Sequence, residues 1–143
     1  MPERDPPVRE HADGSRKTRP FDILVVDDSY PLARALSYAL TRAGYTCRIA
    51  RDGVEALERM DEQPPDLVVL DLRMPRMDGL ETCRRIRENE AWRDAYIIVL
   101  SGIAHEGDAA RAIEAGADEC LSKPFEPPKI LERVRAVLSP VES

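Results

Sequence analysis

Short apolar runs alternate with stretches of helical periodicity along most of this chain, and this alternation limits the possible folds more than any other feature. The runs are rich in Val, Ile and Leu, and each has the length of a single strand. They fall at 23–26, 45–49, 67–70, 96–100 and 119–121. Helical patterns fill the intervals, with Gly or Pro near their ends. The sequence therefore predicts a strand followed by a helix, repeated five times.

The character of the runs indicates how the strands pair. Residues 67–70 are apolar at every position, so we expect a strand that is buried on both faces. Strands that are separated by helices pair in parallel, with right-handed crossovers. We therefore predict an α/β fold of (βα)5 type, a doubly wound parallel five-stranded sheet. Ligands bind such sheets beyond the carboxyl ends of the strands.

The helical stretches carry capping signals and apolar faces. Asp52 followed by Glu55 predicts a capping box for a helix that runs to Met60. Apolar residues at helical spacing predict which side of each helix faces the sheet. The predicted inward residues are Leu32, Ala35, Leu36, Ala39 and Leu40 in the first helix, Ala109, Ala112 and Ile113 in the fourth, and Ile130, Leu131, Val134, Val137 and Leu138 in the last.

Composition and charge exclude several classes of function. The longest apolar run, at 95–100, is too short to cross a bilayer, so we expect a cytoplasmic protein with no membrane contact. A net charge of −6 gives no support for direct binding of nucleic acid. The 3 cysteines are widely spaced and form no CxxC pair, which argues against a disulfide framework or a zinc site.

Polar residues follow the ends of the predicted strands. Asp27 and Asp28 follow the first strand, Asp71 the third, Ser101 the fourth and Lys123 the fifth. Taken singly, an acid after a strand is usually a turn residue or a helix cap. Together the three carboxylates would repel one another by roughly 4 kcal/mol per pair at 4 Å, unless a cation were present. Oxygen ligands without His or Cys favour Mg²⁺.

The remaining residues of this group suggest a phosphoryl site. Arginine is the common cation of this chain, yet position 123 holds lysine, which provides a compact point charge. A metal, an ammonium group, a hydroxyl donor and a nucleophilic carboxylate together suit phosphoryl transfer. A carboxylate that accepts a phosphoryl group forms a reactive acyl phosphate, which suits a transient signal.

Four segments resemble the receiver domain of two-component response regulators. They are ILVVDDS at 23–29, LVVLDLRMPRMDGLE at 67–81, IIVLSG at 97–102 and GADECLSKPF at 116–125. The resemblance covers about 21–138 and implies the flavodoxin-like strand order 2-1-3-4-5. It implies a receiver domain over 21–139, which we expect to lie between a flexible tail at 1–20 and a short tail at 140–143, with no output domain.

The resemblance also implies roles for the residues at the strand ends. Asp71 matches the phosphoacceptor, which takes its phosphoryl group from a phosphohistidine. Mg²⁺ would be bound by the carboxylates of Asp28 and Asp71, by the backbone carbonyl of Arg73, and by Asp27 through water. The chain would assist its own phosphorylation and dephosphorylation without being an enzyme in the ordinary sense.

Further positions match the phosphoryl-binding and switch residues of the family. Ser101, with Gly102 beside it, would turn its hydroxyl to the phosphoryl group, and Lys123 would pair with the phosphoryl oxygens. The bond between Lys123 and Pro124 matches one that is cis in the family. Cys120 stands where the family usually carries Tyr or Phe, so the usual rotation of an aromatic ring is not available at this switch position.

Two interpretations of Cys120 and of Arg73 follow from these departures. Cys120 is either a small packing residue or a redox-sensitive thiol, and the acids at Asp118 and Glu119 would raise its pKa and favour packing. Arg73 is either a solvated surface cation or, together with Ile103, a shield that keeps water from the acyl phosphate.

The implied partners are a histidine kinase or histidine phosphotransfer protein as donor and a protein effector as target. Phosphorylation could also drive formation of a homodimer. One alternative is a pseudo-receiver that binds a partner without being phosphorylated. Another is a phosphohydrolase of the haloacid dehalogenase type, but that family needs a second acid where this chain has Arg73.

Overall fold

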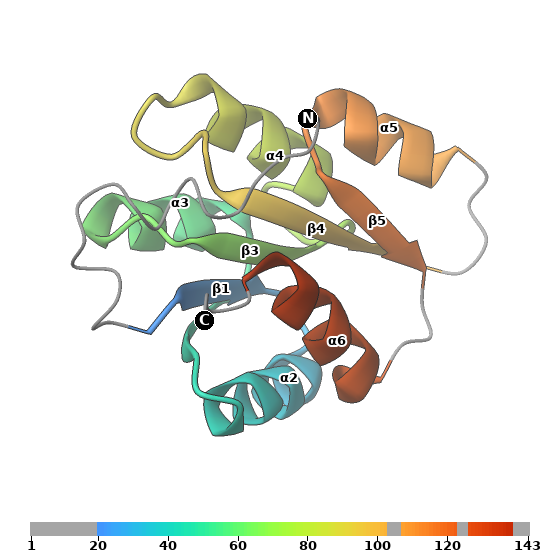
Figure 1. Ribbon diagram of the computed structural model, residues 1–143. Coiled ribbons are helices and arrows are strands. Elements are labelled where there is room, and N and C mark those ends of the chain that lie inside the picture. The colour runs from blue at the N-terminus through green and yellow to red at the C-terminus, as the bar shows by residue number, and fades with distance from the viewer. Residues whose placement is uncertain (1–19, 103–106, 123–125, 139–143) are drawn as a thin grey trace.

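The five predicted strands form one parallel sheet in the computed structural model, which describes residues 20–102, 107–122 and 126–138 (Figure 1). The strand order is β2-β1-β3-β4-β5, and every neighbouring pair is parallel. The predicted α/β class and the order 2-1-3-4-5 are therefore confirmed. The tails expected at 1–20 and 140–143 fall outside the described residues, apart from residue 20.

The elements alternate from strand to helix through the described chain, close to the predicted ranges. The strands are β1 (Asp22–Val26), β2 (Thr46–Ala50), β3 (Leu67–Asp71), β4 (Tyr96–Ser101) and β5 (Glu119–Ser122). The helices are α2 (Tyr30–Arg42), α3 (Gly53–Glu62), α4 (Gly79–Glu88), α5 (Asp108–Ala115) and α6 (Pro127–Val137).

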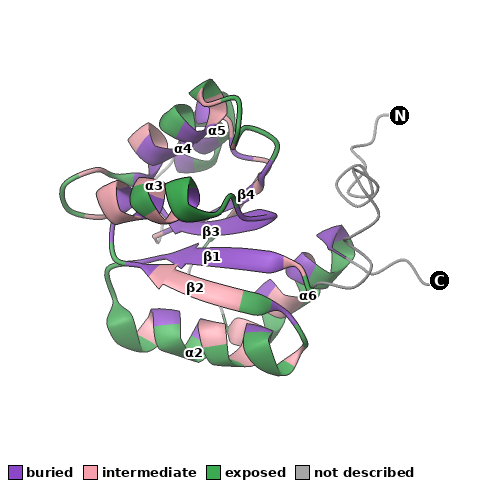
Figure 2. Ribbon diagram, turned by 90° about the vertical axis from the view of Figure 1, so that its left-hand side faces the viewer, coloured by how far each residue is buried: buried purple, intermediate pink, exposed green. Residues whose placement is uncertain are grey.

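The sheet separates two hydrophobic cores. Helices α3, α4 and α5 cover one face and α2 and α6 cover the other (Figure 1). Successive residues of a strand point to opposite faces, so Leu24 and Val26 enter the first core while Ile23 and Val25 enter the second. The central strands β1 and β3 are buried along their whole length, and the edge strand β2 is partly exposed (Figure 2).

Two helical faces differ from the sequence prediction. Helix α2 buries Ala33, Leu36 and Leu40, whereas Ala35 is exposed, so the predicted face is rotated. Helix α5 buries Ala112 and Ala115, whereas Ala109 is exposed and Ile113 is 48% exposed. Both helices carry apolar residues around more than one face, and spacing alone does not determine which face packs against the sheet. Among the described helices, none is long and apolar enough to span a membrane.

The start of α3 confirms one half of the predicted capping box. The carboxylate of Asp52 accepts a hydrogen bond from the backbone N–H of Glu55 at 2.9 Å. The side chain of Glu55 accepts from the backbone N–H of Arg51 rather than from that of Asp52. The cap therefore holds the chain at the end of β2, next to the edge of the sheet where the polar residues gather.

Candidate functional site

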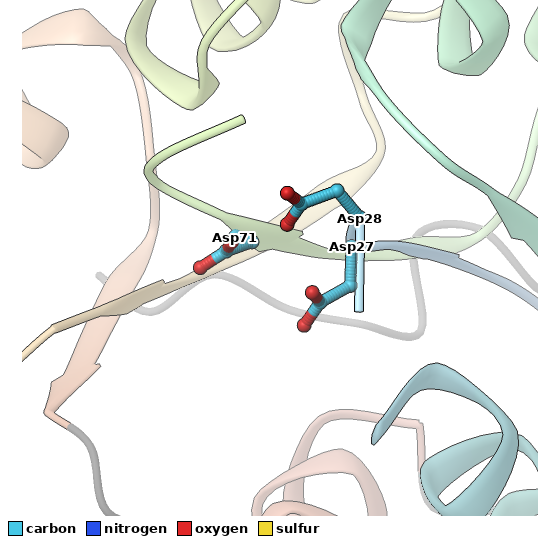
Figure 3. A group of neighbouring side chains, drawn as sticks. All are labelled: Asp27, Asp28 and Asp71. Atoms are coloured by element: carbon cyan, nitrogen blue, oxygen red, sulfur yellow. The ribbon is translucent and has the colours of Figure 1, made fainter. Parts of the chain in front are cut away.

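Three carboxylates meet at the carboxyl ends of the two central strands (Figure 3). Asp27 and Asp28 directly follow β1, and Asp71 is the last residue of β3. Each of the three offers a carboxylate oxygen, and these oxygens all lie within 4.8 Å of one another. Asp27 and Asp71 are buried, and Asp28 is exposed, so the cluster is open to solvent on one side.

The register of the sheet explains why these acids meet. Val26 of β1 is paired with Leu70 of β3, so the next residues, Asp27 and Asp71, lie side by side at the same level. The backbone N–H of Asp27 donates to the carbonyl of Ala50 at 3.1 Å, and its carboxylate accepts from the N–H of Ser29 at 2.9 Å. The end of β2 therefore holds the backbone of Asp27, and the start of the segment that leads into α2 holds its carboxylate.

The cluster fits a divalent cation that prefers oxygen ligands. Carboxylates held this close, two of them away from bulk water, repel one another, and a cation relieves that repulsion. Mg²⁺ takes oxygen ligands in a compact octahedron, usually with one or two carboxylates and several waters. The exposed side of the cluster, at Asp28, leaves room for those waters. The expected ligand role of the Arg73 carbonyl stays a prediction.

A close backbone approach fixes the loop that follows Asp71. The N–H of Gly79 donates to the carbonyl of Leu72 at 2.8 Å. A Cβ atom at position 79 would lie 2.5 Å from the backbone oxygen of Asp71 and 2.8 Å from the Cα of Leu72. Only glycine allows α4 to begin this near the end of β3, so the segment from Leu72 to Asp78, called here the β3–α4 loop, is short and closely held.

The hydroxyl of Ser101, which is predicted to bind a phosphoryl group, lies at the same edge of the sheet, on β4 next to β3. Asp71 is paired with Leu100 of β4, and Ser101, the buried last residue of β4, comes next. Ser101 Oγ donates to the carbonyl of Gly102 at 3.4 Å, a long hydrogen bond. The structure therefore brings Asp27, Asp28, Asp71 and Ser101 to one edge of the sheet, as the sequence predicts.

Part of the predicted site lies outside the described residues. Strand β5 ends at Ser122, which is paired with Ser101, and Lys123 and Pro124 are among the residues that the structure leaves undescribed. Ile103 also falls there. The roles of Lys123 and of the bond to Pro124 stay predictions.

The half-buried side chain of Cys120 has other neighbours than the sequence suggested. Burial raises the pKa of its thiol, the charge of Asp108 raises it further, and a side-chain hydrogen bond with Ser101 lowers it. The expected rise in the pKa of this thiol holds, but burial is its main cause, and the acid that adds to it is Asp108. The carboxylates of Asp118 and Glu119 instead pair with Arg87 and Arg133. A thiol with a raised pKa is protonated at neutral pH, which favours packing over redox chemistry.

Two arginines of the β3–α4 loop make contacts that sequence patterns do not indicate. Arg73 Nη2 lies 3.2 Å from a carboxylate oxygen of Asp108, in the first turn of α5. Arg76 Nε lies 2.7 Å from a carboxylate oxygen of Asp52. The carboxylates of Asp52 and Asp108 are both buried. The sequence indicated a structural role only for Asp52, as a helix cap, and indicated neither arginine partner. The interpretation of Arg73 as a merely solvated cation is therefore incomplete, since it has an ionic partner.

The comparisons with known proteins agree with this geometry. Residues 23–135 match the response regulator receiver domain family. The alkaline phosphatase synthesis transcriptional regulatory protein PhoP of Bacillus subtilis is 40% identical over 116 residues, which are 81% of this chain and 48% of that protein. Response regulator MprA of Mycobacterium sp. (strain KMS) is 43% identical over 119 residues, 83% of this chain and 51% of that protein. The chain thus spans about half the length of these curated relatives.

Solved structures show the same fold over most of the chain. The chemotaxis response regulator CheY4 of Vibrio cholerae has a TM-score of 0.77 at 30% identity, covering 83% of this chain and 99% of that one. The signal receiver domain of a signal transduction histidine kinase from Syntrophus aciditrophicus has a TM-score of 0.77 at 32% identity, covering 86% of this chain and 96% of that one.

Proposed function

The chain belongs to the response regulator receiver domain family of two-component signal transduction, and we propose that it accepts a phosphoryl group on Asp71 from a phosphohistidine and thereby switches a protein-interaction surface. The observation that carries the proposal is the position of Asp71. It ends the central strand β3, is buried, and lies within a cluster of three carboxylates whose oxygens all fall within 4.8 Å of one another.

The proposed reaction uses the carboxylate of Asp71 as nucleophile. One oxygen attacks phosphorus, the bond from phosphorus to the imidazole nitrogen breaks, and that nitrogen keeps the electron pair and takes a proton from solvent. The product is an acyl phosphate on Asp71. When bound, Mg²⁺ offsets the negative charge that the carboxylates and the phosphoryl oxygens bring together. Asp28 and Asp71 would hold it through their carboxylates, and Asp27 through water. The Ser101 hydroxyl and the ammonium of Lys123 would donate to phosphoryl oxygens.

Incubation with acetyl phosphate and Mg²⁺ is expected to add the mass of one phosphoryl group to the intact protein. The same incubation in EDTA is expected to add none, because the clustered carboxylates then repel the anionic donor. Intact-mass spectrometry measures both results. Equal phosphorylation with and without Mg²⁺ would contradict the metal site. No gain in either condition would favour a pseudo-receiver that binds partners without accepting phosphoryl groups.

The proposed partners follow from this chemistry. The donor would be a histidine kinase or a histidine phosphotransfer protein, and the target a protein effector or a second copy of the chain. Helix α2 beside the site offers a surface for recognition, because Tyr30 and Tyr38 are exposed on it. Arg34 and Arg42 lie over their rings, which holds both aromatic side chains in place.

Replacing Arg73 with asparagine is expected to shorten the lifetime of the acyl phosphate several-fold. The arginine side chain begins two residues after Asp71 and can cover the phosphoryl group against attacking water, which a short amide cannot do. The measurement is the loss of phosphorylated mass with time after the donor is removed, in the parent and in Arg73→Asn. A parent that loses its phosphoryl group as fast as the variant would contradict the shielding role.

A further inference from the structure

We propose that Arg73 transmits phosphorylation of Asp71 to helix α5, by transferring its guanidinium from Asp108 to the phosphoryl group. This inference rests on the function proposed above and adds the residue that would couple the site to a helix. The structural basis is a difference between the two arginine pairs that hold the β3–α4 loop.

The ion pair on the α3 side, between Arg76 and Asp52, has two hydrogen bonds, one of them short. Arg76 donates from Nε to Asp52 at 2.7 Å and from Nη2 to the other oxygen at 3.2 Å, a bidentate arrangement. The loop also packs tightly there, because a Cβ at Gly53 would lie 2.9 Å from the Cβ of Met77. Arg76 itself adopts a positive φ of 67°, which the surrounding contacts must stabilise. This side of the loop is therefore the fixed side.

The pair on the α5 side is weaker. Arg73 uses one nitrogen, Nη2, at 3.3 and 3.2 Å from the two oxygens of Asp108. Hydrogen bonds between a cationic nitrogen and a carboxylate are usually about 2.7–2.9 Å long. The side chain of Arg73 is 56% exposed, so its guanidinium can leave Asp108 without a large change in its own hydration. Arg76 is 57% exposed, so exposure alone does not distinguish the two arginines.

Separation of the pair destabilises Asp108 more than it destabilises Arg73. Its side chain is 3% exposed, and besides Arg73 it accepts from Nη2 of Arg111 at 2.6 Å. Helix α5 has Gly107 as its N-cap, with no side-chain capping hydrogen bond. The contacts of Asp108 therefore help to hold the first turn of α5, and a buried carboxylate that loses a cationic partner is destabilised where it lies. The first turn would loosen so that water could replace Arg73.

Phosphorylation supplies the driving force for the transfer. A phosphoryl group carries about −1.5 to −2 charges at neutral pH and offers oxygens that suit the planar guanidinium. It would appear on Asp71, two residues before Arg73. The close approach of Gly79 holds the loop that carries Arg73 against β3. Cys120 has a side-chain hydrogen bond with Ser101 and lies near enough to Asp108 for that charge to raise the pKa of its thiol, but it is too small to act as a moving ring. The ion pair of Arg73 and Asp108 is therefore the connection from site to helix that these residues provide.

Hydrogen exchange of the α5 amides tests the proposal in the whole chain. The amide of Arg111 reports on the start of α5, because its N–H donates to the carbonyl of Gly107 at 2.9 Å. In the parent, acetyl phosphate with Mg²⁺ is expected to speed exchange of this amide roughly tenfold, as expected for the loss of about one charged hydrogen bond that holds the turn. In Arg73→Gln, exchange there is expected to be fast before phosphorylation and to change less than twofold after it. Arg73→Lys keeps the charge and is expected to restore part of the response, which loss of a merely structural contact would not do.

The matched control is Arg76→Gln, on the same loop and with an acid that is also buried. It is expected to keep the full response of α5 to phosphorylation. Intact mass is recorded on every sample, and exchange is compared at equal phosphorylation. If the parent gains no phosphoryl mass, the proposed function fails and this inference with it. If the mass rises but α5 in Arg73→Gln responds as in the parent, or does not respond in the parent, only the inference is overturned.

Discussion

Asp71→Asn is expected to abolish phosphorylation of this protein by acetyl phosphate, with no gain of mass at any Mg²⁺ concentration. The amide has nearly the shape of the carboxylate and lacks the nucleophilic oxygen. The fold should survive, because the change removes one of three mutually repelling carboxylates, a repulsion of roughly 4 kcal/mol per pair at 4 Å for partly buried charges. Intact mass and thermal unfolding of the same samples measure both expectations.

Asp28→Asn is the matched control in the same cluster. It removes a proposed metal ligand that is exposed and leaves the nucleophile in place. We expect phosphorylation to continue but to need at least about tenfold more Mg²⁺, because even the loss of a residue that only supports a metal ligand costs about 10–100-fold in affinity. If Asp71→Asn still gained phosphoryl mass, on Asp27 or Asp28 instead, the assignment of Asp71 as the acceptor would be wrong. Equal loss in both variants would show that metal binding, and not the nucleophile, limits the reaction.

Arg87→Met is expected to lower the free energy of unfolding by about 3 kcal/mol, the scale for breaking a largely buried charged network. The guanidinium donates to the carbonyls of Gly116, Arg93 and Ala95, at 2.6 to 2.8 Å, and to the carboxylate of Asp118 at 2.8 Å. It therefore joins the end of α4 to the segments that enter β4 and β5. Methionine replaces the aliphatic stem and leaves these acceptors without their donor. Urea denaturation gives the difference.

Arg85→Met, on the same helix, provides the comparison. Arg85 pairs with Glu81 at 2.8 Å, but both side chains are well exposed, at 50% and 42%. Exposed pairs at this spacing contribute about 0.3–0.5 kcal/mol, so the variant should unfold almost as the parent does. A similar loss in Arg85→Met and Arg87→Met would mean that helix propensity, not the network of Arg87, accounts for the effect.

The sequence was sufficient to predict the strands, their parallel pairing and most of the acidic site. Strand runs such as 67–70 are apolar without interruption, and in a parallel sheet their carboxyl ends share one edge, so Asp27 and Asp71 had to meet. The prediction was wrong for Ala35, Ala109 and Ile113, because a helix with apolar residues on several faces is oriented by its neighbours and not by its own period.

The arginine pairs could not be predicted in the same way. Arg73 and Asp108 belong to different strand–helix units, and no repeating pattern connects an exposed arginine with a particular acid so far along the chain. A long side chain can reach acids on several neighbouring segments, and only the packed geometry decides which one it contacts. The same holds for Arg87, whose four partners include three backbone carbonyls that side-chain patterns do not describe.

The central pairing of β1 with β3 also has a kinetic consequence. Helix α2, strand β2 and helix α3 all lie between these strands in the chain, but β2 takes the outer edge of the sheet. Asp27 and Asp71 can therefore meet only after this long loop has closed, a non-local contact of the kind that slows folding. During synthesis the acidic cluster appears with β3 and not before, so every shorter nascent chain lacks the acceptor site.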